Sequence, residues 1–174
     1  DGGINEMEEY SKKEELHFKL KLYEIGVSLR LLDIDGVLIL KFFDFFTTPT
    51  IEMVYYLSFF FKELYIYKPL TSRPTNSERY IICKYLVKKE SNLALNIPDN
   101  LSGLFSFLDT RVPQSFINTL RKINNNIVNT QINNIKFVIE KINNEIGDKE
   151  KQYFLNKKNT EQKTFFDELG VKKL

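Results

Sequence analysis

The spacing of apolar residues changes several times along the first half of the chain. Residues 11–32 carry apolar side chains at helical spacing, with polar side chains opposite. Residues 36–40 form an unbroken apolar run of strand length, and residues 49–61 are apolar almost all round a helix. Residues 64–67 and 80–86 are again strand-like. The predicted order of helix, strand, helix, strand, strand indicates an α/β fold.

The first predicted helix begins with a capping box. In this motif the Ser11 side chain bonds to the amide three residues later, and the Glu14 side chain bonds back to the Ser11 amide. We expect one stripe of this helix to face the core. The residues of that stripe are Leu16, Leu20, Tyr23, Val27 and Leu31. His17 lies beside the stripe, where we interpret it as an ordinary helix residue.

The apolar run from Gly36 to Leu40 favours a parallel strand that is covered on both faces. Ligands of open α/β sheets bind outside the carboxyl ends of such strands, so Lys41 follows the strand at a place suited to function. The alternative is a lysine that marks where the strand emerges and extends its amine into water.

The second predicted helix has Thr48 as its cap, Pro49 at its first position and Glu52 in its first turn. Because it is apolar nearly all round, it must be buried on more than one side, or be covered by a part of the protein outside this sequence.

A polar segment with two prolines joins the two later strands, and it is longer than a tight hairpin requires. It reads Lys-Pro-Leu-Thr-Ser-Arg-Pro-Thr-Asn-Ser-Glu-Arg-Tyr over residues 68–80. Its side chains suit contacts with phosphate and ribose. The candidate substrate-binding residues are Lys68, Ser72, Arg73, Asn76 and Ser77. For Lys68, an ordinary exposed lysine at the end of a strand is as good an interpretation as a substrate-binding residue.

Residues 91–174 have no catalytic motif, and their apolar spacing predicts a helical extension. Residues 96–100 predict a turn, and Val112-Pro113 predicts a helix entry. Its amphipathic series ends at Gly147-Asp148, and a last helix is expected over residues 160–169 with Gly170 as its stop. The extension is either a packing or partner-binding appendage or, with two lysine pairs, an RNA-binding arm.

Composition narrows the class of protein. With 174 residues, 43% of them hydrophobic, the chain can bury the core of one folded domain. A net charge of +2 permits a nucleic-acid partner without indicating a dedicated basic domain. One cysteine and one histidine exclude an internal disulfide and a Cys-based zinc cage, so we expect no metal site. Cys83 lies in a strand-like run and is interpreted as a buried small hydrophobe.

The chain shows no signal-peptide pattern, and its longest uncharged apolar stretches are far shorter than a membrane span. We expect a soluble intracellular protein, not a secreted one, and no membrane partner.

Three separated elements together resemble the FtsJ-like ribose 2′-O-methyltransferases: Asp1-Gly2-Gly3, Lys41 and the segment from Lys68 to Glu78. The resemblance covers residues 1–86 and is closest to the mRNA cap-1 branch of eukaryotes and large DNA viruses. This family uses a Lys-Asp-Lys-Glu tetrad. The resemblance maps its last three members onto Asp1, Lys41 and Glu78, and leaves its first lysine without a counterpart.

The resemblance implies a fold, a cofactor and partners. Residues 1–90 would be the C-terminal half of a Rossmann-like methyltransferase sheet with an antiparallel edge pair, followed by the extension of residues 91–174. The methyl donor would be S-adenosyl-L-methionine, and the partners would be the capped 5′ end of mRNA and a missing N-terminal half. No Gly-rich donor loop precedes Asp1, and Asp35-Gly36 stands where a Gly pair is usual.

The resemblance also assigns roles. Lys41 would be the general base in its neutral form, while Asp1 and Glu78 would orient the lysine pair and bind the ribose. Carboxylates alone favour the charged form of a lysine. We therefore expect the intact protein to methylate and the fragment of residues 1–174 not to.

Two other interpretations stay open. The chain could be a noncatalytic RNA-binding or scaffold module that keeps the loop without the donor site. It could also be a purely structural α/β domain, which would leave the polar loop unexplained.

Overall fold

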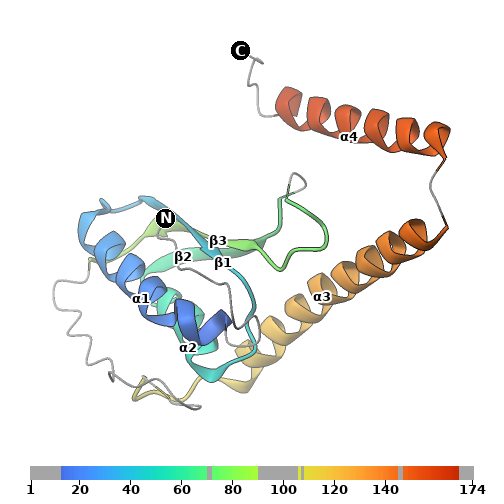
Figure 1. Ribbon diagram of the computed structural model, residues 1–174. Helices are drawn as coiled ribbons and strands as arrows, with labels where there is room; N and C mark the ends of the chain where they lie inside the picture. Colours follow the sequence, from blue (N-terminus) through green and yellow to red (C-terminus); the bar gives the residue numbers. More distant parts are fainter. Residues whose placement is uncertain (1–12, 70–71, 90–105, 107, 145–146, 169–174) are drawn as a thin grey trace. The chain divides into compact units, whose positions relative to one another are not determined.

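The computed structural model describes residues 13–69, 72–89, 106, 108–144 and 147–168 (Figure 1). Its elements, in chain order, are α1 (Lys13–Leu31), β1 (Val37–Phe42), α2 (Thr48–Leu57), β2 (Phe61–Tyr67), β3 (Arg79–Leu86), α3 (Gln114–Asn143) and α4 (Asp148–Glu168). The predicted order of the first five elements and the predicted helical character of the later part are confirmed.

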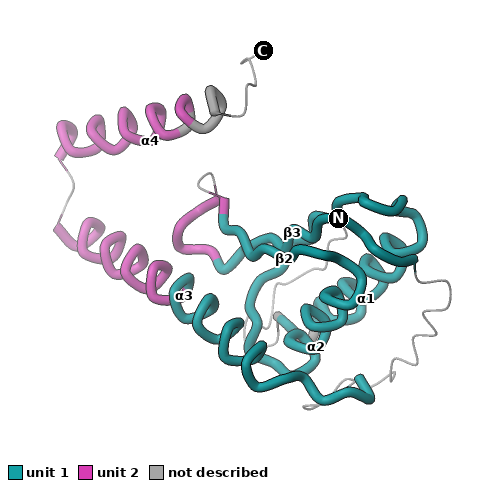
Figure 2. The backbone as a smooth tube through the Cα atoms, turned by 180° about the vertical axis from the view of Figure 1, so that it is seen from behind, with its two compact units in different colours: residues 1–68, 77–127 teal, residues 69–76, 128–174 magenta. Residues whose placement is uncertain are grey.

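The chain divides into two compact units (Figure 2). The first comprises residues 1–68 and 77–127, and holds the sheet, α1, α2 and the first part of α3. The second comprises residues 69–76 and 128–174. The domain boundary predicted between residues 90 and 91 lies within the stretch 90–105, outside the described residues, and it stays a prediction.

The first unit is built on a three-stranded sheet in the order β1-β3-β2. β3 lies in the middle and is antiparallel to both neighbours, so that Ile81 is opposite Leu40 of β1 and Ile66 of β2. The antiparallel pair of β2 and β3 was expected from the family resemblance and is confirmed.

The prediction for β1 is wrong within the described residues. β1 pairs antiparallel with β3, and its burial alternates, with Val37 48% and Ile39 61% exposed. An unbroken apolar run shows only that both faces tolerate apolar contact, and it does not fix the direction of the neighbouring strand. In the described part of the chain, one face of the sheet is covered and the other is open.

The core lies between the covered face of the sheet and the helices α1 and α2 (Figure 1). The strands contribute seven buried apolar side chains to this core: Leu38, Leu40, Phe42, Phe61, Ile81, Cys83 and Leu86. Cys83 is fully buried, as predicted, and burial raises the pKa of its thiol to about 12. The thiol is therefore a packing group, because reactivity requires the thiolate.

α1 turns a different face to the core from the one predicted. The buried side chains are Phe18, Leu22, Ile25 and Leu29, whereas Leu16, Tyr23, Val27 and Leu31 of the predicted stripe are exposed. The helix carries two apolar stripes, and helical spacing is satisfied by either of them. Packing against the sheet, which spacing cannot reveal, selects the second stripe.

The two predicted helix starts also differ from the structure. Ser11 lies outside the described residues, and the Glu14 carboxylate accepts hydrogen bonds from the Phe46 and Thr47 amides at 2.7 and 2.9 Å. Glu14 thus pairs with amides just before α2, where the N-cap is Thr47 rather than Thr48.

Glu52 is not in the first turn of α2, contrary to the prediction. It is 5% exposed, and its carboxylate accepts hydrogen bonds from the Ser106 hydroxyl at 2.6 Å and the Leu108 amide at 3.3 Å. The predicted burial of α2 on more than one side is confirmed. Its buried residues are Pro49, Thr50, Ile51, Glu52, Met53, Val54 and Leu57.

The turn before β1 explains the Asp35-Gly36 pair. Asp35 has a φ of 63°, a left-handed conformation that aspartate tolerates better than most residues. A Cβ at position 36 would lie 2.6 Å from the carbonyl oxygen of Asp33, so only glycine fits there. The Asp35 amide donates to the Leu86 carbonyl at 2.9 Å, which fixes where β1 meets β3.

α4 begins at Asp148, well before the predicted residue 160. Asp148 and Glu150 lie in its first turn, where acidic side chains stabilise a helix N-terminus. The predicted turn at residues 96–100 and the stop at Gly170 lie outside the described residues.

We predict that Leu29→Ala in the 174-residue chain lowers the free energy of unfolding by about 2–5 kcal/mol, because Leu29 is fully buried. The matched control Leu31→Ala, at a leucine of the same helix that is 76% exposed, should change it by less than about 0.5 kcal/mol. Urea unfolding measures both. Equal losses of unfolding free energy in the two variants would contradict the assignment of the Leu29 face of α1 to the core.

Candidate active site

Lys41 and Glu78 form a pair across the start of β3. Lys41 lies in β1 opposite Tyr80, and Glu78 directly precedes β3. The Lys41 Nζ atom is 3.5 Å from Glu78 Oε2, and the two side chains are 30% and 24% exposed. The structure therefore brings together two of the three predicted tetrad residues. The third, Asp1, lies outside the described residues.

Tyr80 completes this cluster, although the sequence did not single it out. Its hydroxyl donates to Glu78 Oε1 at 3.0 Å, so one carboxylate oxygen faces the phenol and the other faces Lys41. Burial raises the pKa of Tyr80, and the hydrogen bond and charge of Glu78 raise it further. The phenol is thus held in its protonated, donating form at neutral pH.

Lys68, predicted to bind substrate, lies against the main chain of Glu78. Its Nζ atom donates to the Glu78 carbonyl oxygen at 2.9 Å. Burial, and then the charge of Arg79, lower the pKa of the Lys68 ammonium. The carboxylates of Glu78 and Asp44 oppose this shift. Lys68 therefore supports the backbone that carries Glu78, rather than extending freely into solvent.

Arg79 is the other residue that sequence reasoning missed. Its side chain is fully buried, and its Nη2 atom pairs with Asp44 Oδ1 at 2.8 Å. The Nη1 atom donates to Asn124 Oδ1, and the Nε atom donates to the Ser77 carbonyl at 3.1 Å. Burial lowers the pKa of Arg79, and the charge of Asp44 opposes that shift. The guanidinium stays charged, because even a lowered arginine pKa lies far above neutrality.

A signal for Arg79 exists in the sequence. Successive side chains of a strand alternate between its faces, so Arg79 shares the face of Ile81 and Cys83. A charge on the apolar face of a strand requires buried partners. The same alternation places Tyr80 on the opposite face, beside Lys41.

The middle of the predicted substrate loop belongs to the second unit. Its backbone is held by turns, with the Ser72 amide donating to Pro69 and the Asn76 amide donating to Arg73, each at 3.0 Å. The Arg73 side chain is exposed. Ser77, the remaining loop candidate, belongs to the first unit, where its carbonyl accepts the bond from Arg79.

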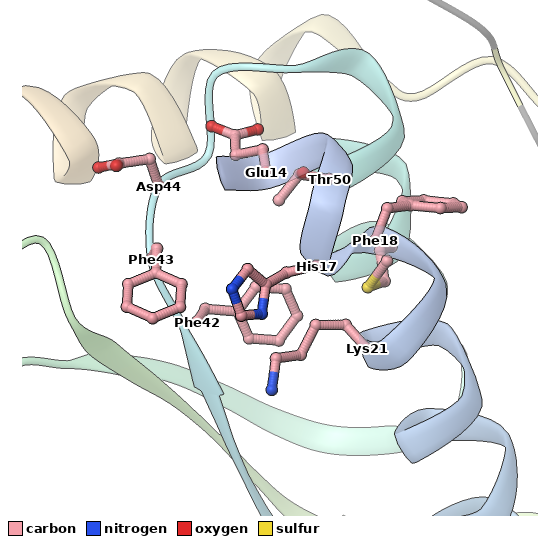
Figure 3. A pocket seen from close by; sticks show the side chains of 9 residues that line it. Glu14, His17, Phe18, Lys21, Phe42, Phe43, Asp44 and Thr50 are labelled. Atoms are coloured by element: carbon pink, nitrogen blue, oxygen red, sulfur yellow. The ribbon is translucent and has the colours of Figure 1, made fainter. Parts of the chain in front are cut away.

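A groove of about 480 Å³ between α1 and β1 has Lys41 and Tyr80 among its lining residues, and its lining is mainly apolar. A smaller cavity of about 20 Å³ has room for no more than a single water molecule. Figure 3 shows this smaller cavity, where the rings of His17 and Phe43 lie 5.1 Å apart. Of these two spaces, the groove is the one that Lys41 lines.

Residues 1–86 match the model of the family described as FtsJ-like methyltransferase. This part of the chain belongs to that family. The resemblance expected from the motifs is therefore confirmed. Lys41 and Glu78, the two predicted tetrad residues that the structure describes, both lie in this matched part of the chain.

Curated relatives match the same part. A probable methyltransferase of African swine fever virus is 45% identical over 84 residues, which are 48% of this chain and 20% of that protein. The human cap-specific mRNA (nucleoside-2′-O-)-methyltransferase 1 is 38% identical over 86 residues, 49% of this chain and 10% of that protein. The Dictyostelium discoideum protein of that name is 39% identical over 109 residues, 63% of this chain and 14% of that protein.

The chain thus spans a fifth or less of the length of these relatives. None of the helices in the described ranges is long and apolar enough to cross a membrane. Among the described residues, no cluster of three or more His, Cys, Asp or Glu side chains is arranged to hold a metal ion.

We predict that Asp44→Ala lowers the free energy of unfolding by about 3–5 kcal/mol, because it removes the carboxylate that pairs with the buried Arg79. Asp33→Ala is the matched control, since Asp33 pairs with Lys89 on the surface at 3.2 Å and is 96% exposed. Its loss should cost less than about 1 kcal/mol. Chemical denaturation measures both losses. If Asp44→Ala costs no more than the control, the pairing of Asp44 with Arg79 does not stabilise the fold as proposed.

Proposed function

We propose that the protein containing these residues transfers a methyl group to a ribose 2′-hydroxyl of RNA, at the cap-proximal nucleotide of mRNA. The observation that carries this proposal is the contact of Lys41 with Glu78, 3.5 Å apart, with Tyr80 holding the second carboxylate oxygen. The membership of residues 1–86 in the FtsJ-like family and the names of the cap-specific relatives support the reaction and the substrate.

The chemistry requires a base and an aligned acceptor. A ribose hydroxyl is a poor nucleophile, so it must lose its proton as the new bond to carbon forms. We assign that proton to the Lys41 amine, which is partly exposed and lines the groove. Glu78 would orient the amine and accept a hydrogen bond from the sugar, as the resemblance implies. Positioning of this kind can supply a large share of a rate enhancement.

The Lys41–Glu78 contact also fits an ordinary ion pair. Partly exposed pairs of this kind add only about 0–1 kcal/mol to stability, so stability gives little reason for it. Its surroundings favour function, because the carboxylate is fixed by Tyr80 and its backbone by Lys68.

S-adenosyl-L-methionine would supply the methyl group on a sulfonium, which makes the carbon electrophilic. Within the described residues, the groove beside Lys41 is mainly apolar and no Gly-rich loop adjoins it, so we assign no donor-binding residue here. We propose that a further half of the protein provides the donor site and the first lysine of the tetrad. Asp1 would join Lys41 and Glu78 there.

RNA would be held by the loop between β2 and β3. Arg73 is exposed and suits a bidentate contact with a phosphate. Ser72, Asn76 and Ser77 would add hydrogen bonds to phosphate or ribose, which position RNA without reading its sequence. Lys68 would add positive charge from beside Glu78, where its contact with the backbone holds it.

In the protein that includes the donor-binding half, Lys41→Ala should lower methyl transfer to cap-0 RNA by at least about 100-fold, because the general base is lost. The thermal melt should stay nearly unchanged, since Lys41 is partly exposed. Lys62→Ala is the control, because Lys62 also lies on the sheet, 3.7 Å from Asp35, with a side chain that is 61% exposed. A tritium-transfer assay measures the rate, and retained activity in Lys41→Ala would exclude Lys41 as the base.

The same assay separates the alternative of a noncatalytic module. That alternative is supported by the fact that no donor-binding residue is assigned among the described residues. A wild-type protein that binds capped RNA but transfers no methyl group would favour it over the enzyme.

Arg73→Ala should weaken RNA binding and reduce the salt slope of the logarithm of the binding constant by about 1, because one phosphate contact is lost. Donor affinity should not change. Arg121→Ala, at an exposed arginine of α3, is the control. Fluorescence anisotropy at several salt concentrations measures the slope, and an unchanged RNA affinity would show that the assignment of Arg73 is wrong.

A further inference from the structure

We propose that Asn124 of α3 is a positioning residue for the Lys41–Glu78 pair, acting through the buried side chain of Arg79. The proposal rests on the proposed methyl transfer and deepens it. It makes the first part of α3 a working part of the active site, although α3 contributes no group to the reacting atoms.

Three consecutive residues at the start of β3, Glu78, Arg79 and Tyr80, alternate between the two sides of the sheet. Glu78 and Tyr80 lie on the open side of the sheet with Lys41, and Arg79 between them points to the covered side. A shift of the Arg79 backbone therefore moves both neighbours. The position of the Glu78 carboxylate depends on where the Arg79 side chain is anchored.

The Arg79 side chain is held by contacts with several segments of the first unit, which we call its anchors. The guanidinium reaches Asp44, which follows β1 three residues after Lys41, and the carbonyl of Ser77. It also lies over the ring of Phe45, with its central carbon 5.4 Å from the ring centroid. These contacts tie the end of β1 to the start of β3. They set the separation of the strands at the level of Lys41 and Glu78.

Asn124 of α3 is a further anchor of Arg79. It is 2% exposed, and its Oδ1 atom accepts a hydrogen bond from Arg79 Nη1 across 45 positions of sequence. The buried residues of α3 are Leu120 and Asn124, one helical turn apart. An apolar residue at position 124 would serve packing equally well but would leave a buried donor of Arg79 without its acceptor. The amide is thus matched to the charge of Arg79.

A displacement of about 1 Å at reacting groups can cost up to about 100-fold in rate. Asn124→Ala removes one of the anchors and leaves Asp44 and Ser77 in place. We expect kcat to fall about tenfold, while KM for capped RNA and the donor affinity stay within about twofold.

Two further variants separate positioning from general destabilisation. Asn124→Asp keeps an acceptor for Arg79 and should restore kcat to within about twofold of wild type. Asn125→Ala changes an exposed asparagine of the same helix turn and should leave kcat unchanged. All rates are measured well below the melting temperature of each variant, in the protein that includes the donor-binding half. Wild-type kcat in folded Asn124→Ala, or an effect on KM alone, would overturn the proposal.

A second readout needs no enzymatic activity. In the wild type, Lys41 Nζ lies 3.5 Å from Glu78 Oε2, and this contact limits the access of an acylating reagent to the amine. Labelling with acetic anhydride, read by mass spectrometry relative to the exposed Lys149, should rise about threefold at Lys41 in Asn124→Ala and remain unchanged in Asn125→Ala. Wild-type protein that labels as expected but transfers no methyl group would reject the proposed function alone. Unchanged Lys41 labelling in folded Asn124→Ala would reject the positioning role.

Discussion

The arrangement of the first unit depends on one buried cation. Arg79 carries a guanidinium into a core of apolar side chains, at a cost that only paired and hydrogen-bonded partners offset. Those partners come from different segments: Asp44 after β1, Ser77 before β3 and Asn124 on α3. Because a buried guanidinium tolerates few arrangements of its acceptors, it fixes how these segments meet.

This constraint explains the difference between the two faces of the sheet. On the covered face, Arg79 follows the same side of β3 as Ile81 and Cys83 and joins the core. On the open face, the same backbone presents Glu78 and Tyr80 to Lys41. The polar site and the packed core are thus two sides of one strand, and neither can shift without the other.

Several features were accessible from sequence because they depend on local patterns or on a family motif. The order of elements followed from apolar spacing, and the Lys41–Glu78 pairing followed from the resemblance of the loop and the strand. The face of α1 was not accessible, because Leu22 and Leu31 belong to two stripes of equal quality and the sheet selects between them. The direction of β1 relative to its neighbour was also hidden, since an apolar run fits either direction. Arg79 and Asn124 are 45 positions apart, and no local pattern links them.

Asp44 and Asn124 both contact the buried side chain of Arg79, and we expect both to stabilise it. A double-mutant cycle of Asp44→Ala and Asn124→Ala, read as free energies of unfolding, tests this expectation most directly. If both act on Arg79, the two losses should be non-additive by about 1 kcal/mol or more. Losses that add within about 0.3 kcal/mol would mean that the two residues act independently, and the account of Arg79 as their shared anchor would be wrong.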